Sequence, residues 1–148
     1  MYLYIIILIS CLFSLSERYH TFYEIQDKLV QWDSEFSNNE NPWPQYPNSG
    51  IIYQLYEIGK STNDSLPIYA AKLSYNADQE NDKAKVLILG QCHAEEIYGV
   101  EIAMELIDWL LHPNANYPVG YSDRQLALQN TEIWVVPTYN PEGLLTVH

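Results

Sequence analysis

The chain has 148 residues, of which 47% are hydrophobic and 18% are charged, a composition typical of a globular domain and not of a disordered tail. Its formal net charge is −12 at pH 7 with only seven lysines and arginines, which argues against nucleic acid as a partner, because holding a phosphate backbone requires basic side chains. The same scarcity leaves no basic patch that an anionic membrane surface would attract.

The first sixteen residues form an apolar block without a charged side chain. The block is too short to span a bilayer and has small residues at alternate positions up to Ser16, which predicts a signal peptide over 1–16 and a secreted or periplasmic protein. It has no lysine or arginine before the apolar core, so a buried strand or a misassigned start is an alternative, and a lipoprotein box that would anchor the chain at Cys11 is another. Removal of the block leaves a mature chain with no transmembrane span and with Cys92 as its only cysteine, which cannot form an internal disulfide.

An amphipathic helix is predicted over 22–36, where apolar residues recur at helical spacing. Thr21 followed by Glu24 forms a capping box at its start. The next segment, 38–50, contains three prolines and four asparagines and is predicted to be a loop.

Two strands, 51–58 and 66–75, follow and are predicted to pair as a hairpin. The continuous apolar run 86–89 is typical of a strand that is buried on both faces. A second helix is predicted over 95–111, since apolar residues recur there at helical intervals up to a His-Pro pair.

A further buried strand is predicted over 133–136, ended by Pro137. Strand, helix and strand in this order imply a crossover between parallel strands, hence an α/β fold with helices covering a sheet. Ligands of such sheets gather at the carboxyl ends of the strands, which directs attention to the residues after Leu89.

That segment, 90–96, reads GQCHAEE and contains His93 and Glu96 three residues apart where the strand turns into the helix. Residues i and i+3 share a helix face, so both side chains can converge on one point, and imidazole and carboxylate are zinc ligands. By spacing alone, the pair is also compatible with chance, with Glu95 and Glu96 complementing the positive end of the helix dipole.

Four segments resemble landmarks of the zinc metallocarboxypeptidase family, in the order in which that family has them. Residues 90–101 (GQCHAEEIYGVE) resemble its first zinc-ligand motif, and 19–25 (YHTFYEI) resemble the start of its first helix. Residues 58–68 resemble its first hairpin, and 132–143 (EIWVVPTYNPEG) resemble the strand and Asn-Pro-Asp-Gly turn that follow. Together the four segments span most of the chain after the predicted signal peptide.

This resemblance implies a three-layer α/β/α fold with a mixed central sheet, in which residues 17–148 are the N-terminal part of a catalytic domain. It implies hydrolysis of the C-terminal peptide bond of peptides or proteins with a Zn²⁺ cofactor, for which His93 and Glu96 match the first two ligands. The third ligand, the general base and the arginines that hold the substrate carboxylate are expected beyond residue 148, so this part alone is expected to be inactive. His148 is a remote alternative for the third ligand.

The remaining candidate residues point to less specific roles. Arg18 and Arg124 precede the turn after which the family has its carboxylate-binding arginines, and Glu95 stands where the family often has arginine. Cys92 is predicted to be a small buried thiol and not a nucleophile. The other histidines, His20 and His112, are expected at the surface near helix ends, with His112 beside the carbonyl end of its helix.

Two other functions remain open at this stage. One is a non-catalytic secreted domain of the same fold, and the other is a related zinc amidohydrolase that acts on peptidoglycan peptides or acylated amino acids. The substrate side-chain preference and the oligomeric state are not determined by the sequence.

Overall fold

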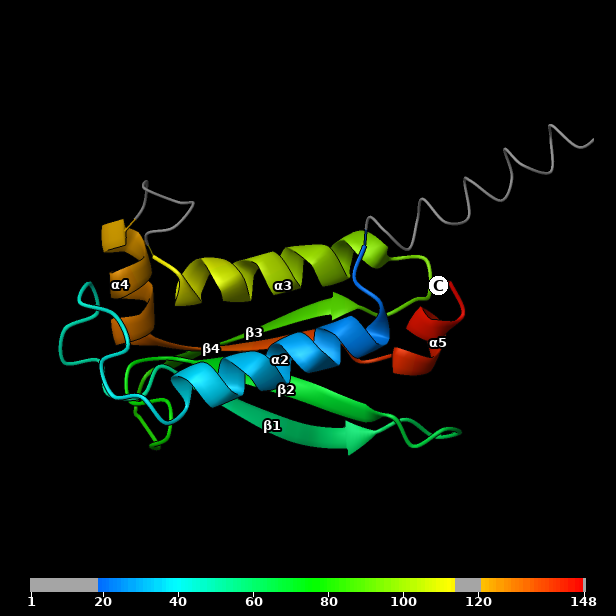
Figure 1. Ribbon diagram of the computed structural model, residues 1–148, viewed down its shortest axis with the longest axis horizontal. Coiled ribbons are helices and arrows are strands. Elements are labelled where there is room, and N and C mark those ends of the chain that lie inside the picture. The colour runs from blue at the N-terminus through cyan, green and yellow to red at the C-terminus, as the bar shows by residue number, and fades with distance from the viewer. Residues whose placement is uncertain (1–18, 114–120, 148) are drawn as a thin grey trace, which may run out of the picture.

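The computed structural model describes residues 19–113 and 121–147, which form a mixed four-stranded sheet with helices packed against it (Figure 1). The signal peptide predicted over 1–16 lies outside the described residues, and so do the side chains of Cys11, Arg18 and His148. Within the described ranges, none of the helices combines the length and the hydropathy that crossing a membrane requires.

The elements follow one another as α2 (Phe22–Phe36), β1 (Tyr53–Lys60), β2 (Pro67–Leu73), β3 (Ala84–Gln91), α3 (Ile97–Leu111), α4 (Tyr121–Asn130), β4 (Thr131–Thr138) and α5 (Pro141–Leu145). The sequence predicts all of them except α4 and α5. The predicted end of the last strand at residue 136 is wrong by two residues, because β4 continues through Pro137 to Thr138.

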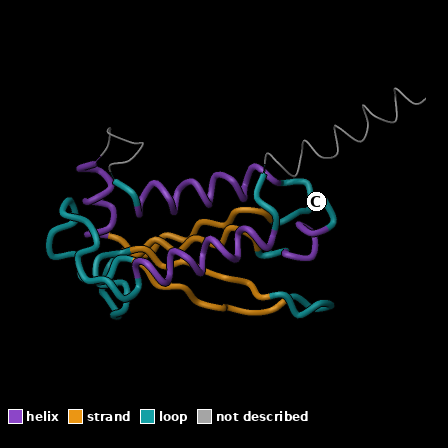
Figure 2. The backbone as a smooth tube through the Cα atoms, viewed as in Figure 1, coloured by secondary structure: helices purple, strands orange, loops and turns teal. Residues whose placement is uncertain are grey.

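The sheet has the strand order β1-β2-β4-β3. Figure 2 shows the strands of the sheet in orange, with helices in purple alongside them. Strands β1 and β2 pair antiparallel, which confirms the predicted hairpin, and β2 pairs antiparallel with β4. Strands β3 and β4 pair parallel, which confirms the predicted crossover through α3. The sheet is therefore mixed, as expected for this α/β fold.

Helix α2 matches its prediction in bounds, cap and buried face. Glu24 donates its backbone N–H to Thr21 Oγ1 at 3.4 Å, and Thr21 donates its own N–H to Glu24 Oε2 at 2.8 Å, which completes the capping box. The buried residues of the helix are Phe22, Ile25, Leu29, Trp32 and Phe36.

Helices α2 and α3 cover the same face of the sheet. Side chains of this face belong to one core cluster with the buried residues of both helices, and Val135 of β4 lies beside Ile88 of β3 in register. Tyr53 of β1 donates its hydroxyl to the carbonyl of Leu29 in α2 at 3.2 Å. Figure 1 shows α5 at the end of the sheet where β3 and β4 finish and α4 at the opposite end.

The prediction that the strand over 86–89 is buried on both faces is wrong for this chain. Strand β3 is at the edge of the sheet, and Leu87 and Leu89 are 63% and 50% exposed. Their side chains point to the face opposite α3, because successive residues of a strand alternate between faces. Within the described residues, no helix covers that face as α2 and α3 cover the other one.

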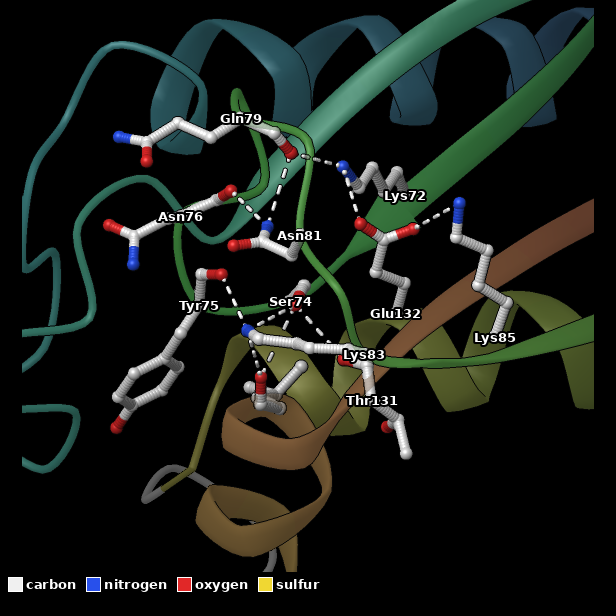
Figure 3. Close-up of polar contacts among 11 residues, drawn as sticks. Lys72, Ser74, Tyr75, Asn76, Gln79, Asn81, Lys83, Lys85, Thr131 and Glu132 are labelled. Carbon is white, nitrogen blue, oxygen red and sulfur yellow. Dashed lines mark hydrogen bonds and ion pairs between the residues drawn. The ribbon is translucent and has the colours of Figure 1, made fainter.

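A polar cluster around the buried Glu132 and Lys72 lies near the start of β4 (Figure 3). The Glu132 carboxylate contacts Lys72 Nζ at 3.1 Å and Lys85 Nζ at 3.7 Å. Lys83 Nζ donates to Ser74 Oγ and to the carbonyl of Tyr75, both at 2.8 Å. Burial lowers the pKa of the Lys83 ammonium from its ordinary value of 10.5. Lys72 Nζ also donates to the carbonyl of Gln79 at 2.8 Å, and the Ser74 hydroxyl donates to that of Thr131 at 2.9 Å, which fastens the loop between β2 and β3 to the sheet.

Candidate metal centre

The segment that joins β3 to α3 is a tight turn and not the first turn of the helix. Helix α3 begins at Ile97 with Glu96 as its N-cap residue, so the predicted helix start at residue 95 is wrong. The backbone N–H of Glu96 donates to the carbonyl of His93 at 3.1 Å, and that of Gly99 donates to the carbonyl of Glu96 at 3.0 Å. The polypeptide therefore reverses within a few residues after leaving the sheet.

His93 and Glu96 converge in this turn. His93 Nδ1 lies 2.8 Å from Glu96 Oε1, while Glu96 Oε2 accepts the backbone N–H groups of His93 at 3.0 Å and of Cys92 at 3.1 Å. The two side chains are 70% and 45% exposed, so an ion from solvent can reach them. The predicted convergence occurs, but through a turn and two backbone donors and not through a shared helix face.

The electrostatics of the pair keep the carboxylate ionised. Hydrogen bonds from the His93 side chain and from the backbone N–H groups of His93 and Cys92 lower the pKa of Glu96 to about 2. The same hydrogen bond and the negative charge of Glu96 raise the pKa of His93 above its ordinary value of 6.5. At neutral pH, Glu96 is therefore an anionic oxygen donor, and its hydrogen bond and charge favour the protonated form of the His93 ring beside it.

The imidazole nitrogen of His93 and the carboxylate oxygens of Glu96 are donor types that zinc binds. Zinc accepts imidazole nitrogen and carboxylate oxygen, and a catalytic zinc site takes three protein ligands and leaves one position open. Across residues 19–113 and 121–147, no three side chains of His, Cys, Asp or Glu are grouped so that they could hold a metal ion. His93 and Glu96 are thus a pair of donors to which a third ligand has to be added.

Cys92 and Tyr139 lie next to this pair. A hydrogen bond with the Cys92 thiol raises the pKa of the Tyr139 hydroxyl, and burial of the hydroxyl raises it further. The thiol is partly exposed, so the prediction of a small buried thiol is wrong, because the chain has already left the sheet at this position. The imidazole beside Cys92 pairs with Glu96, and this geometry does not favour a nucleophilic thiolate.

The two histidines at helix ends lie apart from the pair. His20 binds Glu101 of α3 through its backbone N–H at 2.7 Å and its Nδ1 at 2.8 Å. His112 Nδ1 lies 3.2 Å from the carbonyl oxygen of Asp108 and 3.0 Å from its carboxylate, which confirms the expected contact with the end of α3.

Arg124 binds the backbone at the end of α3. It is fully buried, and its guanidinium donates to carbonyl oxygens at the C-terminal end of α3 and just after it, at 3.0 Å to Trp109 and 2.9 Å to Pro113. It therefore satisfies backbone acceptors that a helix end leaves without partners. Glu95 is exposed in the turn.

Glu142 is a residue of this region that the sequence analysis did not identify. Its carboxylate accepts backbone N–H groups from Asn63 at 2.8 Å and Asp64 at 2.9 Å, together with the Asn63 side-chain amide at 2.8 Å. It thereby ties α5 to the turn between β1 and β2. The sequence signal was its place in the Asn-Pro-Glu-Gly turn, but the partner is 79 residues away.

The contribution of Glu142 to stability is expected to disappear in acid. Hydrogen bonds from the Ser61 hydroxyl and from the backbone amides of Asp64 and Asn63 lower the pKa of Glu142 from its ordinary value of 4.5 to about 2. Because the folded-state pKa is depressed, the stabilisation is present above pH 4.5 and is lost as the pH falls toward 2. We expect the difference in melting temperature between the wild type and Glu142→Gln to be largest above pH 5 and to shrink as the pH approaches 2.

Glu80→Gln is the matched control, since Glu80 is an exposed loop glutamate. Its difference from the wild type should not change over the same pH range. A pH-independent difference for Glu142→Gln would contradict the assigned hydrogen bonds.

The chain is similar in sequence to zinc carboxypeptidases. The sequence model of the family described as "Zinc carboxypeptidase" matches residues 45–148. Carboxypeptidase SOL1 of Arabidopsis thaliana is 26% identical over 92 residues, which cover 62% of this chain and 18% of that protein. Human carboxypeptidase D is 31% identical over 100 residues, which cover 67% of this chain and 7% of that protein.

Solved structures that share the fold include a carboxypeptidase. The crystal structure of carboxypeptidase A from Helicoverpa armigera superposes with a TM-score of 0.63 at 20% identity, covering 86% of this chain and 26% of that one. Thrombin activatable fibrinolysis inhibitor gives the same TM-score at 18% identity, covering 86% of this chain and 27% of that one. The chain therefore corresponds to roughly a quarter of these structures and to 18% or less of the two curated relatives above.

Proposed function

Because this chain belongs to the zinc carboxypeptidase family, we propose that it supplies His93 and Glu96 as the first two ligands of a zinc site that hydrolyses the C-terminal peptide bond of peptides or proteins. The observation that carries the proposal is the 2.8 Å approach of His93 Nδ1 to Glu96 Oε1 in an exposed turn at the carboxyl end of β3. Imidazole and carboxylate are the donor types of a catalytic zinc site.

The role of each group at the proposed zinc site follows from its contacts. The two backbone amides hold Glu96 Oε2, so the carboxylate is oriented before any ion arrives and Oε1 faces the imidazole. Bound zinc supplies Lewis acidity that polarises a carbonyl group and lowers the pKa of a bound water. The third ligand, the general base and the groups that bind the substrate carboxylate belong to a segment beyond residue 148 in this proposal.

The remaining parts of the proposal concern the rest of the chain. Residues 1–16 direct the protein to a secreted or periplasmic location, and residues 17–148 contribute the first strands and helices of the catalytic domain. The substrate is a peptide or protein with a free C-terminal carboxylate.

Calorimetric zinc titration of the full-length protein, as wild type, His93→Ala and Glu96→Ala, tests the metal assignment. We expect each substitution to raise the zinc dissociation constant about 100-fold or more, since loss of even an outer-shell partner of a ligand typically costs roughly 10–100-fold. Circular dichroism confirms that the variants are folded.

Glu95→Ala and His20→Ala are the matched controls. Glu95 is exposed and adjacent to the site, whereas His20 pairs with Glu101, so both controls should bind zinc like the wild type. Equal heats for all five proteins would remove the metal assignment. Zinc binding by the full-length protein without release of a C-terminal amino acid from peptides would favour a non-catalytic domain of the same fold.

A further inference from the structure

Asn140 connects the end of β4 to the turn that carries His93 and Glu96. Its side-chain Nδ2 donates to the carbonyl oxygen of Cys92 at 2.8 Å, and its Oδ1 accepts the backbone N–H of Gly143 at 3.0 Å. The orientation of the carboxamide follows from its partners, because a backbone N–H requires the oxygen on one side and a carbonyl requires the nitrogen on the other. Asn140 therefore caps α5 and also holds the turn.

A second carboxamide reaches the same turn from β3. Gln91, which is fully buried, donates its Nε2 to the carbonyl of His93 at 2.9 Å. The Thr138 hydroxyl donates to Gln91 Oε1 and also accepts the backbone N–H of Asn140 at 3.3 Å. The two successive carbonyls of the turn, those of Cys92 and His93, thus each receive an N–H from a side chain at the end of the sheet.

The carbonyl that Asn140 holds belongs to the same peptide group as a donor to Glu96. The Cys92 carbonyl and the His93 N–H form one planar unit, and that N–H donates to Glu96 Oε2 at 3.0 Å. Because the peptide bond is planar and rigid, fixing the carbonyl at one side fixes the direction of the N–H on the other. Loss of the Asn140 bond frees this peptide group to rotate and weakens one of the two backbone restraints on Glu96 Oε2, while the Cys92 N–H still donates to it.

We propose that Asn140 is a positioning residue for the His93–Glu96 pair, and that it acts by orienting the Cys92–His93 peptide group. The consequence for zinc affinity rests on the function proposed above, whereas the consequence for the turn itself does not. Asn140 touches neither side chain of the pair directly, and its effect passes through the backbone.

The test separates the two roles of Asn140 with substitutions that keep the cap. Serine and aspartate are as good as asparagine at an N-cap, and both retain an oxygen for the Gly143 N–H. Serine does not reach Cys92, and aspartate has no N–H to donate. In the full-length protein, we expect Asn140→Ser and Asn140→Asp to melt close to the wild-type temperature. We also expect them to bind zinc about tenfold more weakly, which is the low end of the roughly 10–100-fold loss typical for residues that orient a metal ligand.

Hydrogen exchange of the His93 backbone amide in the metal-free protein is the second measurement. We expect exchange at this amide to accelerate about tenfold or more in both variants, because the peptide group is no longer held on its carbonyl side. Lys72→Met, which breaks the ion pair with Glu132 near the start of β4, should lower the melting temperature without changing either the zinc affinity or the His93 exchange.

The outcomes distinguish the two proposals. If the wild type binds no zinc but the His93 amide exchanges faster in the Asn140 variants, the zinc function fails and the positioning role stands. Unchanged His93 exchange and unchanged zinc affinity in folded Asn140→Ser would overturn the positioning role and leave the zinc function intact.

Discussion

Replacement of Lys72 by methionine is expected to lower the free energy of unfolding by about 3 kcal/mol. The substitution leaves the Glu132 carboxylate, whose side chain is only 2% exposed, without the ammonium that lies 3.1 Å away. A buried carboxylate without its partner has lost its hydration, and the remaining contacts with the protein do not compensate for that loss. The loss is expected at the low end of the usual range because Lys85 Nζ remains 3.7 Å from the same carboxylate.

The double variant Lys72→Met/Glu132→Leu separates this explanation from a simple loss of packing. Since it removes both charges, it should recover most of the stability lost in the single variant. Chemical denaturation with guanidinium measures all three proteins. A double variant that is less stable than Lys72→Met would show that the cost arises from packing or from the Lys72 bond to the carbonyl of Gln79, and not from the unpaired charge.

Gly90→Ala is expected to cost a similar amount, about 3 kcal/mol, for a steric reason. A Cβ atom at position 90 would lie 2.2 Å from the carbonyl oxygen of Pro137 in β4 and 2.9 Å from that of Gly99 in α3. Both neighbours are backbone atoms of packed elements, so relief of the overlap requires strand β4 or helix α3 to move. The measurement is the free energy of unfolding from chemical denaturation.

Gly59→Ala provides the matched control for this substitution. No atom lies within 4 Å of the position that its Cβ would occupy, so the expected change is within about 0.5 kcal/mol. If Gly90→Ala were as well tolerated as this control, the close contact of α3 with β3 and β4 at Gly90 would be disproved. Because Gly90 directly precedes the turn, we also expect weaker zinc binding by any folded Gly90→Ala protein.

The helices predicted from the sequence are those whose formation depends on local signals. Helix α2 has its periodic apolar residues and its Thr21–Glu24 capping box within one segment, and its bounds are as predicted. Helix α4 has no comparable apolar period, and its Arg124 looks like a surface residue until the carbonyls at the end of α3 surround it. Its existence is decided by tertiary contacts.

The convergence of His93 and Glu96 was predicted from the sequence, but its geometry was not. The spacing of His93 and Glu96 indicated convergence, and the two side chains do meet. The two side chains converge because Glu96 is the N-cap residue of α3 and its carboxylate accepts two backbone N–H groups of the turn. This geometry depends on where the helix begins. The contact of Asn140 with Cys92 joins residues 48 positions apart and has no signature in local sequence.

The sequence by itself predicted the order of the elements other than α4 and α5, the hairpin and, through the resemblance to a known family, the two candidate ligands, because periodicity, capping and short motifs are properties of short segments. The tertiary structure alone decided which strand lies at the edge, which charges are buried and which side chains hold the turn. These features arise from pairing across long distances in the chain. The exposed Leu87 and the buried Glu132 show the difference most clearly, since each has the burial opposite to that expected of its residue type.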